Sequence, residues 1–140
     1  MADGNGTKLA GKASYQSDSY IFNMNDSSAS SHTLDMGDSG KTYMLYSTVV
    51  RTITLPAVKA GLKFKFIATD TTADSSIATN EGTALIFGGA ECGDAYLTLA
   101  GTTIIVEAAG AVGDHLEFIC DGTYWYVSGH GSHDASFSVT

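Results

Sequence analysis

The sequence predicts an all-β fold, an antiparallel β-sandwich or jelly-roll-like domain with an extended N-terminal arm. Short runs rich in β-branched and aromatic residues recur along the chain, and clusters of Gly, Asp, Asn and Ser separate them. No long window shows the 3.6-residue period of an amphipathic helix. These observations together favour many short strands joined by tight turns.

Residues 1–31 are expected to form the arm, because Ser, Asp, Asn and Gly dilute a few apolar residues there. Isolated anchors, Tyr15, Tyr20, Ile21 and Phe22, suit such a segment to docking on a partner surface. A short strand is possible at Tyr20–Met24. The alternative is a frayed terminus.

Residues 32–140 are expected to form the β-sandwich. In residues 62–68, Leu62, Phe64 and Phe66 alternate with Lys63 and Lys65, which is the period of a half-buried strand. The expected strands are His32–Met36, Lys41–Tyr46, Val50–Leu55, Leu62–Ala68, Thr83–Phe87, Ala95–Leu99, Thr102–Ala108, His115–Cys120, Thr123–Ser128 and an edge strand at Ser136–Val139.

Turn residues punctuate these strands. Asp121-Gly122 between two β-prone runs predicts a hairpin with a type I′ turn. Pro56 is expected to end a strand because it has no N–H to donate. Gly-Asp recurs before strands at residues 37–38, 93–94 and 113–114, but the flanking residues do not repeat, so no solenoid is predicted.

The charge argues against several function classes. The 140-residue chain, one domain by length, carries a net charge of −8, and its 7 basic residues are scattered. Nucleic-acid binding and attachment to anionic membranes are therefore disfavoured. The N-terminus lacks the pattern of a signal peptide and no apolar run is long enough to span a membrane, so we expect synthesis in a cytoplasm.

The two cysteines, Cys92 and Cys120, match no zinc or redox spacing. Cys120 lies in the apolar run Leu116–Cys120, which predicts a small buried hydrophobe. A disulfide between the two is the less expected alternative in a chain made in a cytosol.

A resemblance to a known family rests on two stretches. The first stretch is Thr52-Ile53-Thr54-Leu55-Pro56-Ala57, followed by Gly61-Leu62-Lys63-Phe64-Lys65-Phe66. The second stretch is Gly113-Asp114-His115-Leu116-Glu117-Phe118-Ile119-Cys120-Asp121-Gly122-Thr123-Tyr124-Trp125-Tyr126-Val127. Over residues 50–129 the chain resembles virion surface proteins of tailed phages, including head decoration proteins and tail-fibre segments. The resemblance implies a trimeric or otherwise symmetric β protein on the particle.

We therefore expect a non-enzymatic structural virion protein without cofactors, a capsid decoration or cement protein made in the host cytoplasm. Its expected partners are two further copies in a homotrimer and the major capsid protein. The alternative is a receptor- or carbohydrate-binding module of a phage tail fibre. An exposed aromatic platform near Asn or Asp side chains would favour that alternative.

Several groups of residues are candidates for functional sites. His130, His133 and Asp134 could ligate a metal, but a flexible polar tail is the favoured interpretation. Asp114, His115 and Glu117 could serve acid–base chemistry, but a turn and a solvated strand face are favoured. No Gly-x-Ser-x-Gly elbow occurs, and Gly88-Gly89 lack the Lys of a phosphate loop. Trp125 is expected in the core. The expected interface residues are Tyr15, Tyr20, Ile21, Phe22, Tyr124 and Tyr126.

Overall fold

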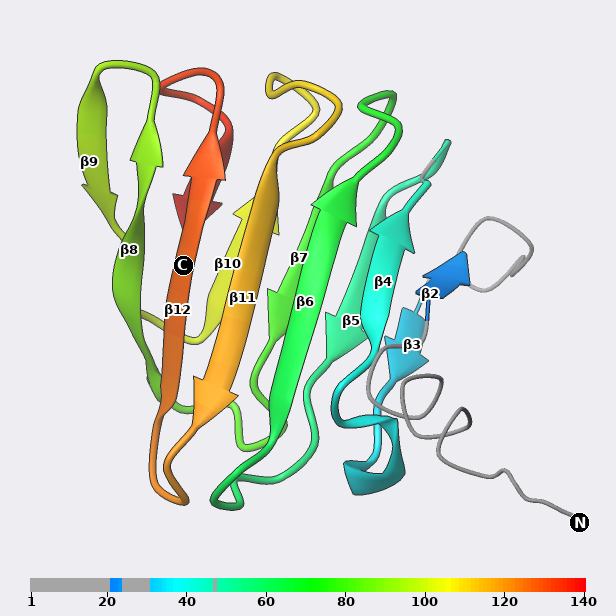
Figure 1. Cartoon of the computed structure of the whole chain (residues 1–140), viewed down its shortest axis with the longest axis vertical. Coiled ribbons are helices and arrows are strands. Elements are labelled where there is room, and N and C mark those ends of the chain that lie inside the picture. Colours follow the sequence, from blue (N-terminus) through cyan, green and yellow to red (C-terminus); the bar gives the residue numbers. More distant parts are fainter. Residues whose placement is uncertain (1–20, 24–30, 47) are drawn as a thin grey trace, which may run out of the picture.

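Two β-sheets pack face to face and confirm the predicted sandwich (Figure 1). The computed structural model describes residues 21–23, 31–46 and 48–140. Apart from the sheets, the described part of the chain contains one 3₁₀ turn, η3 (Met36–Asp38), which a capping box between Asp35 and Asp38 holds in place. No helix in the described residues is long and apolar enough to span a membrane.

Seven strands of the described residues form the larger sheet. In spatial order they are β2 (Ile21–Asn23), β4 (Thr42–Leu45), β6 (Lys63–Ala68), β11 (His115–Cys120), β12 (Trp125–Gly131), β8 (Ile86–Cys92) and β9 (Ala95–Thr98). The first of these, β2, comes from the segment expected to be an arm, and it pairs with β4 of its own chain.

The smaller sheet is formed by five strands in the part of the chain that the structure describes. Their order is β13 (Phe137–Val139), β10 (Thr103–Val106), β7 (Ser75–Ala78), β5 (Arg51–Thr54) and β3 (Ser31–Thr33). The predicted edge position of the last strand is confirmed, because β13 pairs only with β10 among the described strands.

The sheets are mixed, although purely antiparallel pairing was expected. From β2 to β7 each strand lies in the opposite sheet from the one before it, so neighbours such as β4 and β6, or β5 and β7, run parallel. Parallel neighbours need a crossover, and here the crossover is a strand of the other sheet rather than a helix. A parallel pair, β8 and β12, also occurs in the larger sheet, next to β9.

One apolar core fills the space between the sheets. Trp125 is fully buried, as expected, and its ring lies 5.9 Å from that of Phe64. Cys92 and Cys120 are buried free thiols, which excludes the disulfide alternative and confirms Cys120 as a small buried hydrophobe.

Three local expectations were wrong. The strand expected over residues 32–36 ends at Thr33, because Asp35 caps η3. No strand was expected at Ser75–Ala78, which has a single large apolar residue, Ile77, yet β7 forms there. The strand expected to end at Phe87 continues to Cys92.

The predicted hairpin is confirmed, but its turn is longer than a type I′ turn. Cys120 pairs with Trp125, so residues 121–124 form the loop, and Asp121 N–H donates to the Tyr124 carbonyl at 3.1 Å. Only Gly122 has a positive φ there, 104°, whereas a type I′ turn needs two such residues. The strand β5 ends at Thr54, and Pro56 comes just after it, separated by Leu55, as expected of a residue that ends a strand.

Candidate binding faces

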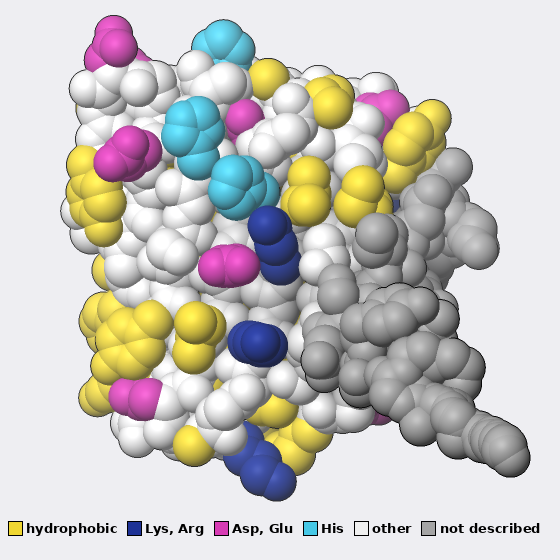
Figure 2. Space-filling model, in the orientation of Figure 1, with side chains coloured by type: hydrophobic (Ala, Val, Ile, Leu, Met, Phe, Trp, Pro, Cys, Tyr) yellow, Lys and Arg dark blue, Asp and Glu magenta, His cyan; other side chains and the backbone are white. Residues whose placement is uncertain are grey.

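The outer face of the seven-stranded sheet carries a cluster of exposed apolar side chains (Figure 2). We call it the aromatic patch; its members are Phe87, Tyr96, Ile119, Tyr124 and Tyr126. Their exposed fractions range from 38% for Tyr124 to 66% for Tyr96. Apolar side chains gathered in this way on a rigid sheet are a signature of binding surfaces.

Strand register holds the aromatic patch together. Tyr126 lies between Ile119 of β11 and Phe87 of β8, because it is the register partner of both. The Phe87 and Tyr124 rings meet edge to face, with centroids 5.1 Å apart. Tyr96 lies over Gly89, where an added Cβ would come within 2.5 Å of the tyrosine ring.

Asp121 gives the aromatic patch a polar border. Its Oδ1 accepts hydrogen bonds from the N–H groups of Tyr124 and Thr123, both at 2.8 Å, and these bonds lower the pKa of the carboxyl. The Tyr126 side chain also bonds to Asp121. Partial desolvation of the tyrosine and this bond raise the pKa of Tyr126. The phenol therefore stays protonated and can donate.

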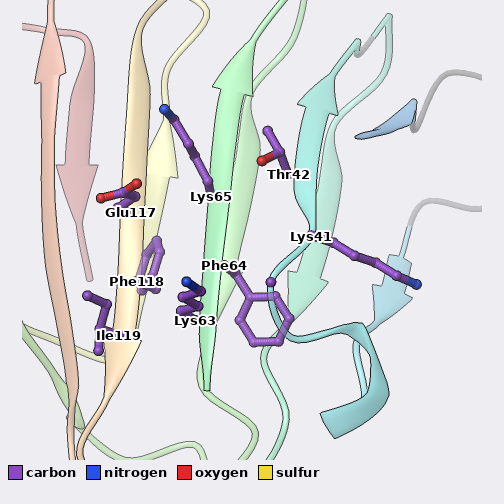
Figure 3. Close-up of a pocket in the computed structure, with 9 residues that line it drawn as sticks. Lys41, Thr42, Lys63, Phe64, Lys65, Glu117, Phe118 and Ile119 are labelled. Atoms are coloured by element: carbon purple, nitrogen blue, oxygen red, sulfur yellow. The ribbon is translucent and has the colours of Figure 1, made fainter. Parts of the chain in front are cut away.

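A hollow of about 250 Å³ adjoins the patch across β6 and β11 (Figure 3). We call it the lysine hollow. Lys41, Lys63 and Lys65 line it, together with Gly40, Thr42, Phe64, Glu117, Phe118 and Ile119. Lys41 extends away from β6 and pairs with Asp38 at 2.5 Å. Lys65 lies opposite Glu117 in the register, whereas Lys63 lies opposite the uncharged Ile119.

The outer face of the five-stranded sheet is different in chemistry, and we call it the hydroxyl face. Its outward strand positions are Ser31, Thr33, Thr52, Thr54, Ser76, Ala78, Thr103, Ile105 and Ser138. All but Ala78 and Ile105 are Ser or Thr, and none is charged. Register aligns them in rows across the strands, for example Thr33, Thr54, Ala78 and Thr103.

The structure places only part of the predicted interface set. Tyr124 and Tyr126 are exposed neighbours within the aromatic patch. Ile21 and Phe22 lie in β2 at one edge of the seven-stranded sheet, away from the patch in the strand order. Tyr15 and Tyr20 lie outside the described residues.

The residues weighed for metal or acid–base chemistry do not form such a site. Within the described residues no cluster of three potential metal ligands occurs, so His130, His133 and Asp134 do not converge. His130 instead stacks on His115, its partner across the hairpin, with ring centroids 6.3 Å apart. Asp114 is buried and binds loop backbone, while Glu117 is exposed on its strand.

Sequence reasoning missed most of both faces. Phe87, Tyr96 and Ile119 come from separate strands, and only the register of β8, β11 and β12 brings them beside Tyr126. The hydroxyl face did leave a signal, the alternation Ser31-His32-Thr33 and Thr52-Ile53-Thr54. Comparison of the chain with protein-family models, curated proteins and solved structures finds no match.

Proposed function

We propose that this chain is a non-enzymatic structural protein of a virus particle, a decoration or cement protein that binds the outer capsid surface and stabilises the shell. The hydroxyl face carries the proposal. A face of small, uncharged side chains can approach another protein closely, and the one carboxylate that hydrogen-bonds to a residue of this face in the described part of the chain, Glu107, accepts from the Ser138 hydroxyl. It lies on a chain whose net charge is −8, so contact through it avoids the acidic surface.

The two faces suit different surroundings. The hydroxyl face would lie against the capsid, with hydroxyl groups free to exchange water for protein partners. The opposite face presents lysines and exposed aromatic side chains to the outside. A sandwich with two such unlike faces supports a protein that covers one surface and displays another.

The size of the hydroxyl face argues for many weak contacts. Five strands of three or four residues at strand spacings of about 4.8 Å give a face on the order of 250 Å². A standard stable interface buries roughly 800 Å² on each partner. We therefore propose that trimerisation and the N-terminal residues add contacts, and that repetition over the capsid lattice supplies avidity.

Two measurements test this function. Purified protein added to capsids that lack it should co-sediment with them, and Thr52→Lys, which puts a charge on the hydroxyl face, should abolish co-sedimentation. The matched control is Thr98→Lys, an exposed strand position on the other sheet. Equal binding by both variants would contradict the proposed docking face. Light scattering should give three times the 14.6 kDa chain mass.

A second candidate function is a receptor- or carbohydrate-binding module, as in a tail fibre. The aromatic patch with Asp121 at its border favours it, because sugar binding combines ring stacking with carboxylate hydrogen bonds. A glycan screen that returns no ligand would remove this candidate and leave capsid docking unaffected.

A further inference from the structure

We infer that the aromatic patch and the lysine hollow form one continuous site for an anionic saccharide, a chain of pyranose rings that carry carboxylate groups. The inference rests on the second candidate function and names the ligand class of that site. It is independent of capsid docking, which uses the opposite face of the sandwich.

The two parts of the site meet at Ile119, which belongs to both. One register row crosses the sheet from Lys63 on β6 through Ile119 and Tyr126 to Phe87 on β8. Three strand spacings of about 4.8 Å make this row roughly 14 Å long. The row can therefore hold a short oligosaccharide laid across the strands, charged at one end and aromatic at the other.

The aromatic end fits a sugar ring. A pyranose has an apolar C–H face and a rim of hydroxyl groups, so it stacks on an aromatic ring and hydrogen-bonds sideways. Tyr126 is 46% exposed and Phe87 is 39% exposed, so both offer ring surface to a ligand. Asp121 and the Tyr126 hydroxyl, already bonded to each other, provide an acceptor and a polar group at the rim.

The lysine side chains at the other end of the row favour a negatively charged ligand. Of the lysines in the described residues, only Lys59 is not part of the hollow lining, and Arg51, the other basic residue there, is buried. Within the hollow Lys41 pairs with Asp38 and Lys65 lies opposite Glu117, so Lys63 carries the positive charge that this face offers a ligand. Lys63 is the best placed partner for a carboxylate, since its cross-strand neighbour Ile119 is uncharged.

Charge complementarity also separates the saccharide from other anions. A nucleic acid presents a phosphate at every nucleotide, and so few lysines on a chain of net charge −8 would not offset the repulsion. Saccharides in which only some of the rings carry a carboxylate combine a sparser charge with the apolar ring faces that the aromatic patch can stack. Nucleic-acid binding is accordingly an outcome that would count against the inference.

The test uses the full chain and two polymers, partly methyl-esterified polygalacturonate, which carries a carboxylate on only some of its rings, and the fully esterified, uncharged form, in titration calorimetry at low and physiological salt. We expect binding of the partly esterified polymer that weakens with salt. Tyr126→Ala should weaken it about tenfold, the effect of losing a typical hot-spot aromatic. Lys63→Gln should weaken it several-fold and reduce the salt dependence. Matched controls, Tyr46→Ala and Lys59→Gln, should bind as the parent does.

The contrary outcomes are distinct. Equal affinity for the uncharged polymer would overturn the anionic class while the carbohydrate-binding function stands. Equal affinity for single-stranded DNA would reduce the site to general anion binding and overturn the inference. Failure to bind either polymer, together with an empty glycan screen, would remove both the inference and the second candidate function. Circular dichroism of each variant checks that the fold is retained.

Discussion

The carboxylate of Asp114 accepts a hydrogen bond from the backbone N–H of Ser132 at 2.9 Å, and so ties together two loops that are distant in the sequence. The other carboxylate oxygen accepts from Ala111 N–H, also at 2.9 Å. The side chains of Ser136 and Ser132 add hydrogen bonds. Asp114 is only 3% exposed, so this turn residue acts as a buried link between the loops that flank β11 and β12.

Asp114→Asn should destabilise the fold. An amide has one acceptor oxygen, so its NH₂ group would face a backbone N–H that loses its partner. A buried donor left unpaired costs about 1–3 kcal/mol, and bonds to a charged group lie at the upper end. Urea unfolding measures the loss. Asp94→Asn, at an exposed Gly-Asp turn, is the matched control and should leave the midpoint unchanged.

Acid should weaken the fold through the same group. Burial of the Asp114 carboxyl would raise its pKa, but hydrogen bonds from Ser136, Ala111 and Ser132 outweigh it and the pKa is lowered. A folded pKa below the unfolded value of about 3.9 stabilises above that pH, and the contribution disappears as the pH falls through the folded pKa. The unfolding free energy should therefore fall below about pH 4, and less steeply in Asp114→Asn. Identical pH profiles would show that Asp114 is not involved.

Trp125→Ala should cost about 3–5 kcal/mol of unfolding free energy, because it removes a fully buried indole that packs on Phe64. The indole Nε1 finds no hydrogen-bond partner within the described residues. Trp125→Phe should therefore cost much less, since it loses some packing but also removes an unpaired buried donor. Tyr124→Ala, at a half-exposed neighbour, is the control. A thermal melt unchanged in Trp125→Ala would contradict this account of the core.

The predictable part of the fold is the part coded by local pattern. Alternation in residues 62–68 and 115–120 predicted β6 and β11 closely, because each strand buries one face against a single core. The pairing partners were not predictable in this way. Parallel pairs such as β4 and β6 depend on the intervening strand β5 entering the other sheet, which is a long-range choice. In β7, burial between β5 and β10 overrides the weak strand signal of Ser75–Ala78.

Some residues of the candidate site could likewise be predicted from the sequence, whereas others could not. Tyr124 and Tyr126 could be assigned to the face opposite Trp125 because residues alternate along a strand. Their neighbour Phe87 could not, because it is 39 residues away from Tyr126 in sequence and meets it only through the parallel pair of β8 and β12. Lys63 and Lys65 were visible as one strand face, but their position beside Ile119 again required the register.

Both thiols should resist modification in the folded protein. Cys92 is 1% exposed, and burial together with the nearby carboxylates of Asp114 and Asp134 raises its thiol pKa. Cys120, the last residue of β11 in the β11–β12 hairpin, is 2% exposed. A chromogenic disulfide reagent at pH 8 should titrate no thiol in the native state and both thiols in guanidinium without reductant. Failure to recover both after unfolding would indicate a disulfide.

The parallel pairing of β8 and β12 depends on Gly88. An added Cβ at Gly88 would lie 2.1 Å from the Val127 carbonyl oxygen, and the φ of Gly88 is +136°. A side chain there would force the strands apart, since the clash is with backbone that cannot rotate away. This pairing also holds Phe87 beside Tyr126, so it positions the aromatic patch.

Gly88→Ala should therefore destabilise the fold by at least about 3 kcal/mol, or prevent folding, because backbone strain and a backbone clash add. Gly61→Ala is the matched control, since Gly61 has a φ of +90° but an added Cβ would meet nothing within 4 Å. That variant carries only the strain of a positive φ, about 1 kcal/mol. The urea midpoints of the two variants separate the cost of the backbone clash from the strain of a positive φ. Equal midpoints would show that β8 and β12 do not approach as closely as described. If Gly88→Ala fails to fold, the two variants are compared by solubility instead: Gly88→Ala should accumulate in inclusion bodies, whereas Gly61→Ala should stay soluble.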